Sequence, residues 1–305
     1  MLLYGPPGSG KSMLAARLPG LLPALSREEA FEVSAIRAAA ALAPETAHFI
    51  ERPFRSPHHT SSAQAMVGGG PLLRPGEISL AHHGVLFLDE LPEFDRRVLE
   101  ALREPLENGR IGLARAARRL ELPARFQLIA AMNPCPCGYL GDPGIECRCS
   151  RSRIEQYRQR LSGPLLDRID MRVRVERLPP GELLRAAGAR TVDDGTGAAG
   201  RAGSVAADAL SDAALRRSIQ AARQWRLARS LNAHLGAAEL TACCRLSDSA
   251  VQLLHRSCQR WALSGRGVQR LLALSRTIAD LVASEPVEAA HLAEALQLRR
   301  TFEWH

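Results

Sequence analysis

One short segment near the start of the chain constrains the fold more than any other feature. It runs Gly5, Pro6, Pro7, Gly8, Ser9, Gly10, Lys11 and Ser12, and it matches the phosphate-loop pattern G-x-x-x-x-G-K-[ST] in full. An apolar run, Leu2-Leu3-Tyr4, precedes it and a helical pattern follows, which is the context that the motif requires. Glycines let the backbone curl so that successive amides point at phosphate oxygens. We therefore predict that Lys11 binds the β- and γ-phosphates of ATP and that the Ser12 hydroxyl ligates Mg²⁺.

The basic residues support a special role for this lysine. Of the 40 basic residues one is Lys11 and the other 39 are arginine. With the heavy use of Ala, Leu and Gly, this indicates the coding bias of a GC-rich genome. A lysine retained under such bias occupies a position where arginine will not serve. The net charge of +8 fits two interpretations equally, compositional drift on a solvated surface or a nucleic-acid footprint.

Two adjacent carboxylates follow a second apolar run. Asp89 and Glu90 come directly after Val85-Leu86-Phe87-Leu88, which is typical of a buried strand. Open α/β sheets bind ligands at the carboxyl ends of their strands. We predict that Asp89 holds Mg²⁺, mostly through water, and that Glu90 polarises the attacking water.

Two further polar residues follow predicted strand positions. Asn133 ends the apolar run that begins at Phe126, where its amide would orient the lytic water and sense the γ-phosphate, or Asn-Pro would merely begin a turn. Arg168 precedes the last predicted strand, where it would stabilise charge on the transferred phosphoryl group. The alternative for Arg168 is a salt bridge to Asp167 or Asp170.

The chain divides into two predicted domains. Residues 1–178 alternate short apolar runs with helical patterns, which is typical of a parallel sheet flanked by helices. Residues 179–210, rich in Gly, Ala, Asp and Thr, predict a linker. Residues 211–305 have helical patterns, with Ser211 and Ser247 as expected N-caps.

At this point the motifs resemble those of the AAA+ ATPases. More narrowly, four segments look like the magnesium-chelatase-like ComM/YifB family: Arg52-Pro-Phe-Arg-Ser-Pro-His-His-Thr60, Arg74-Pro-Gly-Glu-Ile-Ser-Leu-Ala-His82, Leu88-Asp-Glu-Leu-Pro-Glu-Phe94 and Ala131-Met-Asn-Pro-Cys-Pro-Cys-Gly138. The resemblance implies an α/β AAA+ core with helices on both faces of a parallel sheet, followed by an α-helical lid. It also implies a hexameric ATP-hydrolysing motor that drives branch migration of DNA in natural transformation.

The resemblance assigns roles residue by residue. It implies phosphate and Mg²⁺ binding by Lys11 and Ser12, metal and water contacts by Asp89 and Glu90, a first sensor at Asn133 and a finger at Arg168 that reaches a neighbouring subunit's nucleotide. It implies a second sensor at Arg266, with Arg270 as a close competitor.

The resemblance also implies a separate N-terminal domain ahead of the ATPase. Here the phosphate loop begins at residue 5, and the segment that would cover the adenine base is missing with that domain. This predicts either a truncated reading frame, which we favour, or a stand-alone ATPase of impaired nucleotide affinity.

Four of the seven cysteines form a cluster. Cys135, Cys137, Cys147 and Cys149 make two C-x-C pairs, and four thiolates from two tight turns can close a tetrahedral, structural Zn²⁺ site. An iron–sulfur cluster and reduced thiols without metal are the alternatives. The remaining cysteines, Cys243, Cys244 and Cys258, lie on helical segments and are expected to be small core residues.

Two other segments are candidates for binding DNA or a metal ion. Residues 111–122 predict a hairpin with Arg115, Arg118 and Arg119 at its tip, which are either phosphate contacts on DNA or a solvated turn. His58 and His59 share another insertion with the glycines 68–70, and we expect hydrogen-bonded structure there in preference to a metal site.

Location and function follow from these features. The sequence has no run of ~18 apolar residues and no signal pattern, and its odd, clustered cysteines fit a reducing compartment, so we expect a cytoplasmic protein without a membrane partner. Three functions remain open: a DNA-translocating motor, a magnesium-chelatase ATPase subunit, and a non-catalytic fragment that serves in assembly.

Overall fold

The computed structural model describes residues 1–42, 51–115, 118–179, 181, 212–228, 240 and 243–300. The chain divides into two compact units, Met1–Arg177 and Leu178–His305, which are described separately. Apart from residues 179 and 181, the predicted linker over 179–210 lies outside the described residues, as does Ser211.

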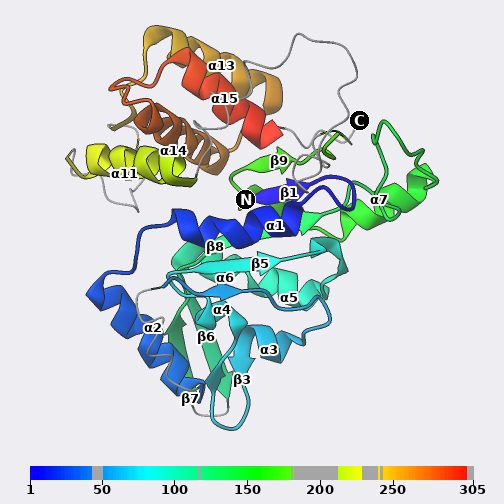
Figure 1. The fold of residues 1–305 in the computed structure, drawn as a ribbon, viewed down its shortest axis with the longest axis vertical. Helices are drawn as coiled ribbons and strands as arrows, with labels where there is room; N and C mark the ends of the chain where they lie inside the picture. The colour runs from blue at the N-terminus through cyan, green and yellow to red at the C-terminus, as the bar shows by residue number, and fades with distance from the viewer. Residues whose placement is uncertain are drawn as a thin grey trace. The chain divides into compact units, whose positions relative to one another are not determined.

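A five-stranded sheet organises the first unit, with its strands in the order β2-β5-β8-β1-β9 (Figure 1). All neighbouring strands are parallel. The strands are β1 (Leu2–Tyr4), β2 (Phe54–Arg55), β5 (Val85–Leu88), β8 (Gln127–Met132) and β9 (Arg172–Arg174). The central strands β5 and β8 are almost entirely buried, as expected for a parallel sheet covered on both faces. The α/β prediction is confirmed, while the two-residue β2 is too short to leave a periodic signal in the sequence.

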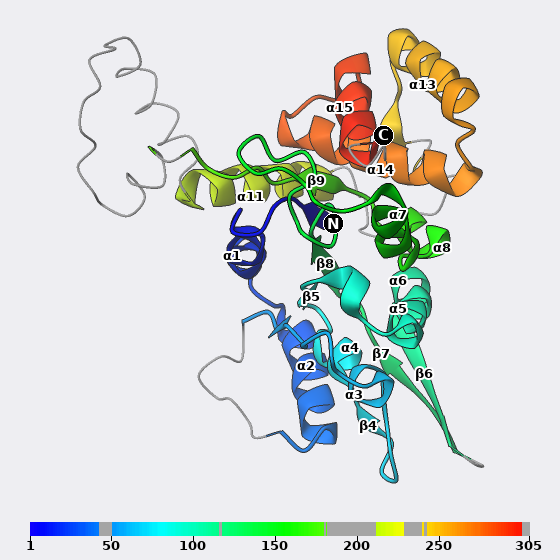
Figure 2. The ribbon, with the colours of Figure 1, turned by 90° about the vertical axis from the view of Figure 1, so that its right-hand side faces the viewer.

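Helices cover this sheet from two sides. Figure 2 shows α1 (Lys11–Arg17) and α2 (Arg27–Ala39) on one side and α5 (Arg96–Ala101) and α6 (Arg103–Asn108) on the other. α7 (Arg151–Gln159) and α8 (Gly163–Asp167) follow later in the chain. The sheet core packs Leu3, Phe87 and Ile129 against Ala15 of α1. Burial of these apolar side chains holds β1, which leads into the phosphate loop, in one sheet with β5 and β8, which lead to Asp89 and Asn133.

Two small antiparallel hairpins extend the first unit. β6 (Arg110–Arg115) and β7 (Arg118–Pro123) pair in antiparallel register, with Arg115 opposite Arg118, which confirms the predicted hairpin. Figure 2 shows this pair running away from the sheet. The second hairpin joins β3 (Gly68–Gly69) to β4 (Arg74–Pro75) between the short helices α3 (Ala63–Val67) and α4 (Glu77–Leu80).

The second unit is helical, as predicted. Its helices are α11 (Asp212–Ala228), α13 (Asp248–Trp261), α14 (Gly265–Leu281) and α15 (Ala289–Arg300). Ser247 caps α13, because its hydroxyl accepts a hydrogen bond from the Ala250 amide at 3.3 Å. Cys244 is fully buried in the helical core. Cys243 and Cys258 are only partly buried, so the expectation that all three are core residues is wrong for these two.

Within the described part of the chain, no helix is both long and apolar enough to cross a membrane.

Candidate nucleotide site

The phosphate loop joins β1 to α1 through backbone conformations that glycine supplies. Gly8 and Gly10 have φ angles of 76° and 87°, in the left-handed region where side chains are disfavoured. At Gly5 a Cβ atom would collide with the carbonyl oxygen of Val175 just after β9. The motif's glycines are therefore required by local geometry.

Lys11 lies at the start of α1 with its ammonium turned into the loop. Its Nζ donates to the carbonyl oxygens of Gly5 at 2.9 Å and Pro6 at 2.8 Å, and lies 3.3 Å from Oδ1 of Asn133. Burial lowers the pKa of Lys11, while the nearby Asp89 carboxylate opposes that shift. The ammonium is thus held at the mouth of the loop, next to the amide at the end of β8.

Ser12 and Asp89 meet at the same edge of the sheet. The Ser12 hydroxyl donates to Oδ2 of Asp89 at 2.6 Å, which joins the first residues after the phosphate loop to the end of β5. A hydroxyl and a carboxylate are oxygen ligands of the kind that Mg²⁺ prefers. The structure therefore brings Lys11 and Ser12 together with Asp89 and Asn133, which are far from them in the sequence.

Glu90 adopts a conformation that is unusual for a residue with a side chain. Its φ is 51°, and such strain concentrates at functional sites. Its Oε2 lies 3.0 Å from Nδ1 of His59, and its amide donates to Oδ1 of Asp89 at 2.9 Å. The expected hydrogen-bonded role of the histidine pair therefore holds, because His58 Nδ1 also lies 2.8 Å from the Thr60 hydroxyl. No local signal indicated that His59 meets Glu90.

Arg168 is the C-cap of α8, and its side chain is almost fully buried. It forms an ion pair with Glu107 of α6 and donates to the carbonyl oxygen of Pro164 at 2.6 Å. Glu107 is a partner that the sequence did not suggest. A role for Arg168 at a neighbouring subunit's nucleotide stays a prediction.

Arg266 and Arg270 lie in the first turns of α14, whose N-cap Ser264 accepts a hydrogen bond from the Gly267 amide at 3.1 Å. They belong to the second unit. Their expected role as second sensor stays a prediction.

The four clustered cysteines converge as the sequence predicts. Cys135 is buried, and its Sγ lies 3.4 Å from that of Cys137 and 3.6 Å from that of Cys147. The ligand atoms of all four, Cys149 included, lie within 4.8 Å of one another. Sulfurs about 2.3 Å from a central ion stand about 3.8 Å apart in a tetrahedron, so the donor set and its spacing fit Zn²⁺.

The cysteines of the cluster differ in acidity, since the pKa of Cys137 is lowered and those of Cys135, Cys147 and Cys149 are raised. Although burial raises it, hydrogen bonds from the backbone of Tyr139 and Arg148 bring the pKa of Cys137 down to about 6. Thiolates are the form that binds metal. Burial raises the pKa of Cys135, so a bound cation is what would allow all four to ionise together.

A second group of potential ligands escaped the sequence analysis. His82 Nε2 and His83 Nε2 lie 2.9 and 2.7 Å from Oε2 of Glu32. The amide of Arg125 donates to Nδ1 of His82 at 2.9 Å, so the neutral ring carries its proton on Nε2 and donates it to Glu32. This junction is satisfied by hydrogen bonds, and it ties α2 to the segment before β5.

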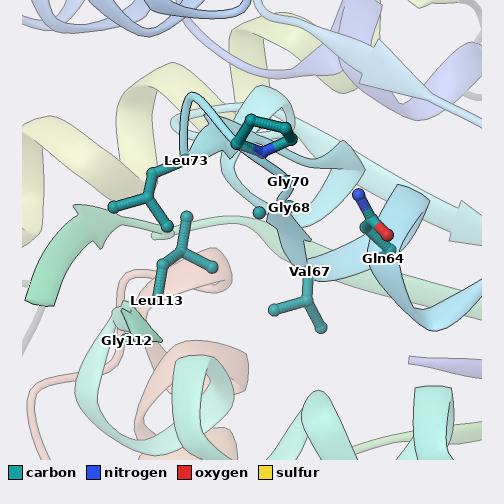
Figure 3. Close-up of a pocket in the computed structure, with 9 residues that line it drawn as sticks. Gln64, Val67, Gly68, Gly70, Leu73, Gly112 and Leu113 are labelled. Carbon is teal, nitrogen blue, oxygen red and sulfur yellow. The ribbon is translucent and has the colours of Figure 1, made fainter. Parts of the chain in front are cut away.

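The glycine-rich hairpin borders a cavity of about 630 Å³. Figure 3 shows Gln64, Val67 and Leu73 around it, with Leu113 of β6 facing them. At Gly68 a Cβ atom would collide with the carbonyl oxygen of Arg74, so the turn depends on glycine. The cavity lies where the β3–β4 turn approaches β6.

A parallel sheet with a phosphate loop after β1 and carboxylates after β5 defines a P-loop nucleotide-binding protein. The family described as magnesium chelatase, subunit ChlI, matches residues 1–183, and its C-terminal counterpart matches residues 209–299. This chain belongs to the magnesium-chelatase-like family of AAA+ proteins.

The chain is also similar to individual proteins over almost its whole length. The chain is 45% identical over 98% of its length to YifB of Escherichia coli (strain K12) and 44% identical over 98% to competence protein ComM of Haemophilus influenzae. Each match covers 55% of the relative, so the chain spans about half the length of the curated relatives it matches. A 100-residue stretch is 33% identical to DNA replication licensing factor Mcm6 of Drosophila melanogaster, of which it covers 11%.

Proposed function

We propose that this chain is the ATP-hydrolysing part of an oligomeric AAA+ motor that acts on DNA. The observation that carries the proposal is the convergence of four side chains at one edge of the sheet: Lys11, Ser12, Asp89 and Asn133. A cation for the phosphates, oxygen ligands for Mg²⁺ and a polar group beside the γ-phosphate are what phosphoryl transfer from a nucleoside triphosphate requires.

In this proposal each group acts on a different part of MgATP. The amides of the loop and the Lys11 ammonium neutralise the β- and γ-phosphates, while Ser12 and Asp89 hold Mg²⁺. Glu90 accepts a proton from the water that attacks the γ-phosphorus, and the bond to the β-phosphate oxygen breaks, which releases ADP and phosphate. Asn133 orients that water, since its amide already lies beside Lys11.

The proposed assembly is a homo-oligomeric ring, with a hexamer as the expected size for a AAA+ protein. Arg168 of one subunit would supply positive charge to the nucleotide of the next. This requires Arg168 to exchange Glu107 for a phosphate oxygen when the ring closes.

DNA is the proposed substrate on two grounds. Arginines line the strands of the β6–β7 hairpin, and guanidinium groups on a projecting hairpin suit phosphate binding. The names of ComM and Mcm6 connect relatives with competence and with DNA replication. We propose single-stranded or branched DNA and a role in branch migration during natural transformation.

Steady-state ATP hydrolysis with and without single-stranded DNA tests this proposal, with Glu90→Gln as the control for contaminating ATPase. We expect hydrolysis that DNA stimulates and that the control lacks. Hydrolysis that is indifferent to DNA would overturn the DNA substrate, and no hydrolysis above the control would leave an assembly module as the function.

A magnesium-chelatase ATPase subunit is the second candidate, since the matching family carries that description. Such a subunit would couple the same hydrolysis to metal insertion by partner proteins. It predicts ATP hydrolysis without stimulation by DNA, so the same measurement separates the two candidates.

We also propose that the four-cysteine cluster holds one structural Zn²⁺. The sulfur spacing and the lowered pKa of Cys137 support it. Elemental analysis of protein purified without chelator is expected to give one zinc per chain. Iron in its place would indicate an iron–sulfur cluster, and four freely titrating thiols without either metal would overturn the site.

A further inference from the structure

We propose that the metal loop, residues 134–149, is a structural part of the nucleotide site, so that Zn²⁺ bound by its cysteines fixes the phosphate loop and Asn133 in their binding geometry. The inference rests on the nucleotide site proposed above. It gives the zinc a role in nucleotide affinity as well as in folding.

The first step is the position of the metal loop in the chain. Asn133 directly follows β8, and the first cysteine, Cys135, is two residues further on and fully buried. On the other side Cys149 leads straight into α7, where the buried Tyr157 is hydrogen-bonded to the backbone of Asn133. The chain before the metal loop and the helix after it therefore both reach Asn133, the residue beside Lys11.

The second step is a direct contact with the phosphate loop. The Gly138 amide donates to the Cys135 carbonyl oxygen at 3.0 Å, which closes the turn of the first cysteine pair. A Cβ atom at Gly138 would lie 2.6 Å from Cδ of Pro7 and 3.7 Å from Cγ of Asn133. The turn that the metal would organise is thus packed against a rigid proline ring of the phosphate loop.

The third step is an anchor on the far side of the metal loop. Arg174 of β9 donates to the Gly141 carbonyl oxygen at 3.1 Å, and the buried carboxylate of Asp142 lies 3.6 Å from Arg177. β9 pairs with β1, the strand that leads into the phosphate loop. The metal loop therefore spans from Pro7 to the strand next to β1.

The fourth step is the dependence of the metal loop's order on the bound metal. Residues 134–149 contain no helix or strand, so few backbone hydrogen bonds oppose the entropy of a long loop. Four metal–sulfur bonds supply that constraint, and metal binding then includes the free energy of ordering the loop. Loss of the metal releases Pro7 and Asn133 together.

Such coupling is reciprocal, because two ligands that favour the same ordered state tighten each other by the same factor. Typical couplings correspond to about 5- to 150-fold in affinity. We expect zinc-stripped protein to bind a fluorescent ATP analogue more weakly by a factor in this range, and zinc to restore the affinity. Bound nucleotide is expected to hold zinc more tightly against a chelator by the same factor.

Two glycine variants separate the contact from the strain of the substitution. Gly138 and Gly141 both have positive φ angles, 85° and 76°, so alanine is strained at either position. Only at Gly138 would the new methyl group meet Pro7, because at Gly141 the nearest atom lies 3.7 Å away. We expect Gly138→Ala to keep its zinc and lose nucleotide affinity, and Gly141→Ala to keep both.

Hydrogen exchange provides a readout that does not need nucleotide. The backbone amides of Gly5 and of residues 8–12 are expected to exchange faster after zinc removal and in Gly138→Ala, while those of β6 are unchanged. Equal exchange and equal affinity with and without zinc, or equal effects of the two alanine variants, would overturn the inference. If zinc protects residues 5–12 but the parent protein binds no nucleotide, the proposed function fails and the coupling stands.

Discussion

At the scale of single residues, Lys11 offers the simplest test of the nucleotide site. Lys11→Ala removes the only ammonium at the loop, and since charge-assisted hydrogen bonds are worth about 1.5–3 kcal/mol, ATP affinity should fall by about 10- to 100-fold. Glu90→Gln, which keeps the shape of the side chain, should bind ATP normally and hydrolyse it very slowly. Equilibrium binding measures the first effect and steady-state hydrolysis the second. Parental ATP affinity in Lys11→Ala, or parental hydrolysis in Glu90→Gln, would contradict the site.

The burial of Arg168 changes how its variants should be interpreted. Arg168→Ala removes a buried partner of Glu107, so slow hydrolysis alone would fit either a finger or a structural ion pair. Glu107→Gln breaks the ion pair and keeps the guanidinium. If Arg168 acts on nucleotide, hydrolysis should fall by about 10³- to 10⁵-fold in Arg168→Ala and stay near the parent in Glu107→Gln.

Thermal unfolding of both variants is the matching control. A similar loss of stability with a large loss of hydrolysis only in Arg168→Ala supports the finger. Equal loss of hydrolysis in both would assign Arg168 to structure.

At the scale of elements, the β6–β7 hairpin makes a prediction about salt. Replacing Arg115, Arg118 and Arg119 by alanine should weaken single-stranded DNA binding. The slope of log affinity against log salt should become shallower by about 0.7 for each phosphate that the hairpin no longer binds. Arg110 at the base of the hairpin is the control, since it is ion-paired with Glu121 at 3.0 Å. An unchanged slope in the triple variant would mean that the tip is only a solvated turn.

The junction of α2 with the segment before β5 predicts acid sensitivity. Burial lowers the pKa of His82 below its usual 6.5, so the unfolded chain binds its proton first as the pH falls. Its contribution to stability is complete above pH 6.5 and is lost as the pH falls toward the lower folded pKa. Hydrogen bonds from His82 and His83 lower the pKa of Glu32. The contribution of Glu32 to stability is therefore lost at a lower pH than that of His82, below pH 4.5.

Urea unfolding of the parent at pH 7.5 and 5.5 checks this expectation. The parent should be less stable at the lower pH, and His82→Gln should show a smaller difference. An identical difference in the variant would show that other groups cause the acid sensitivity.

At the scale of the whole molecule, the proposed ring leads to a test by mixing. A Lys11→Ala subunit still carries Arg168, and an Arg168→Ala subunit still carries an intact phosphate loop. Mixed rings should recover part of the hydrolysis that each variant lacks alone. Confirmed co-assembly with no recovered hydrolysis would refute a role for Arg168 between subunits.

The features that the sequence could predict are local, and those it could not predict depend on the folded molecule as a whole. The phosphate loop, the strand before Asp89 and the cysteine pairs are local patterns, since neighbouring residues supply their glycines, apolar runs and thiols. The contact of Gly138 with Pro7, the pair of Arg168 with Glu107 and the junction at His82 join residues far apart in the chain. No local periodicity marks such contacts, because the folded sheet creates them.

The burial of a solitary lysine has a practical consequence for chemistry on this protein. Acylating reagents modify amines, and apart from the α-amino group this chain offers them a single target, Lys11. That amine is held by the carbonyl oxygens of Gly5 and Pro6, so its rate of acylation reports on the phosphate loop alone. The extent of Lys11 modification in a mass spectrum would therefore serve as a gauge of nucleotide occupancy without any substitution in the chain.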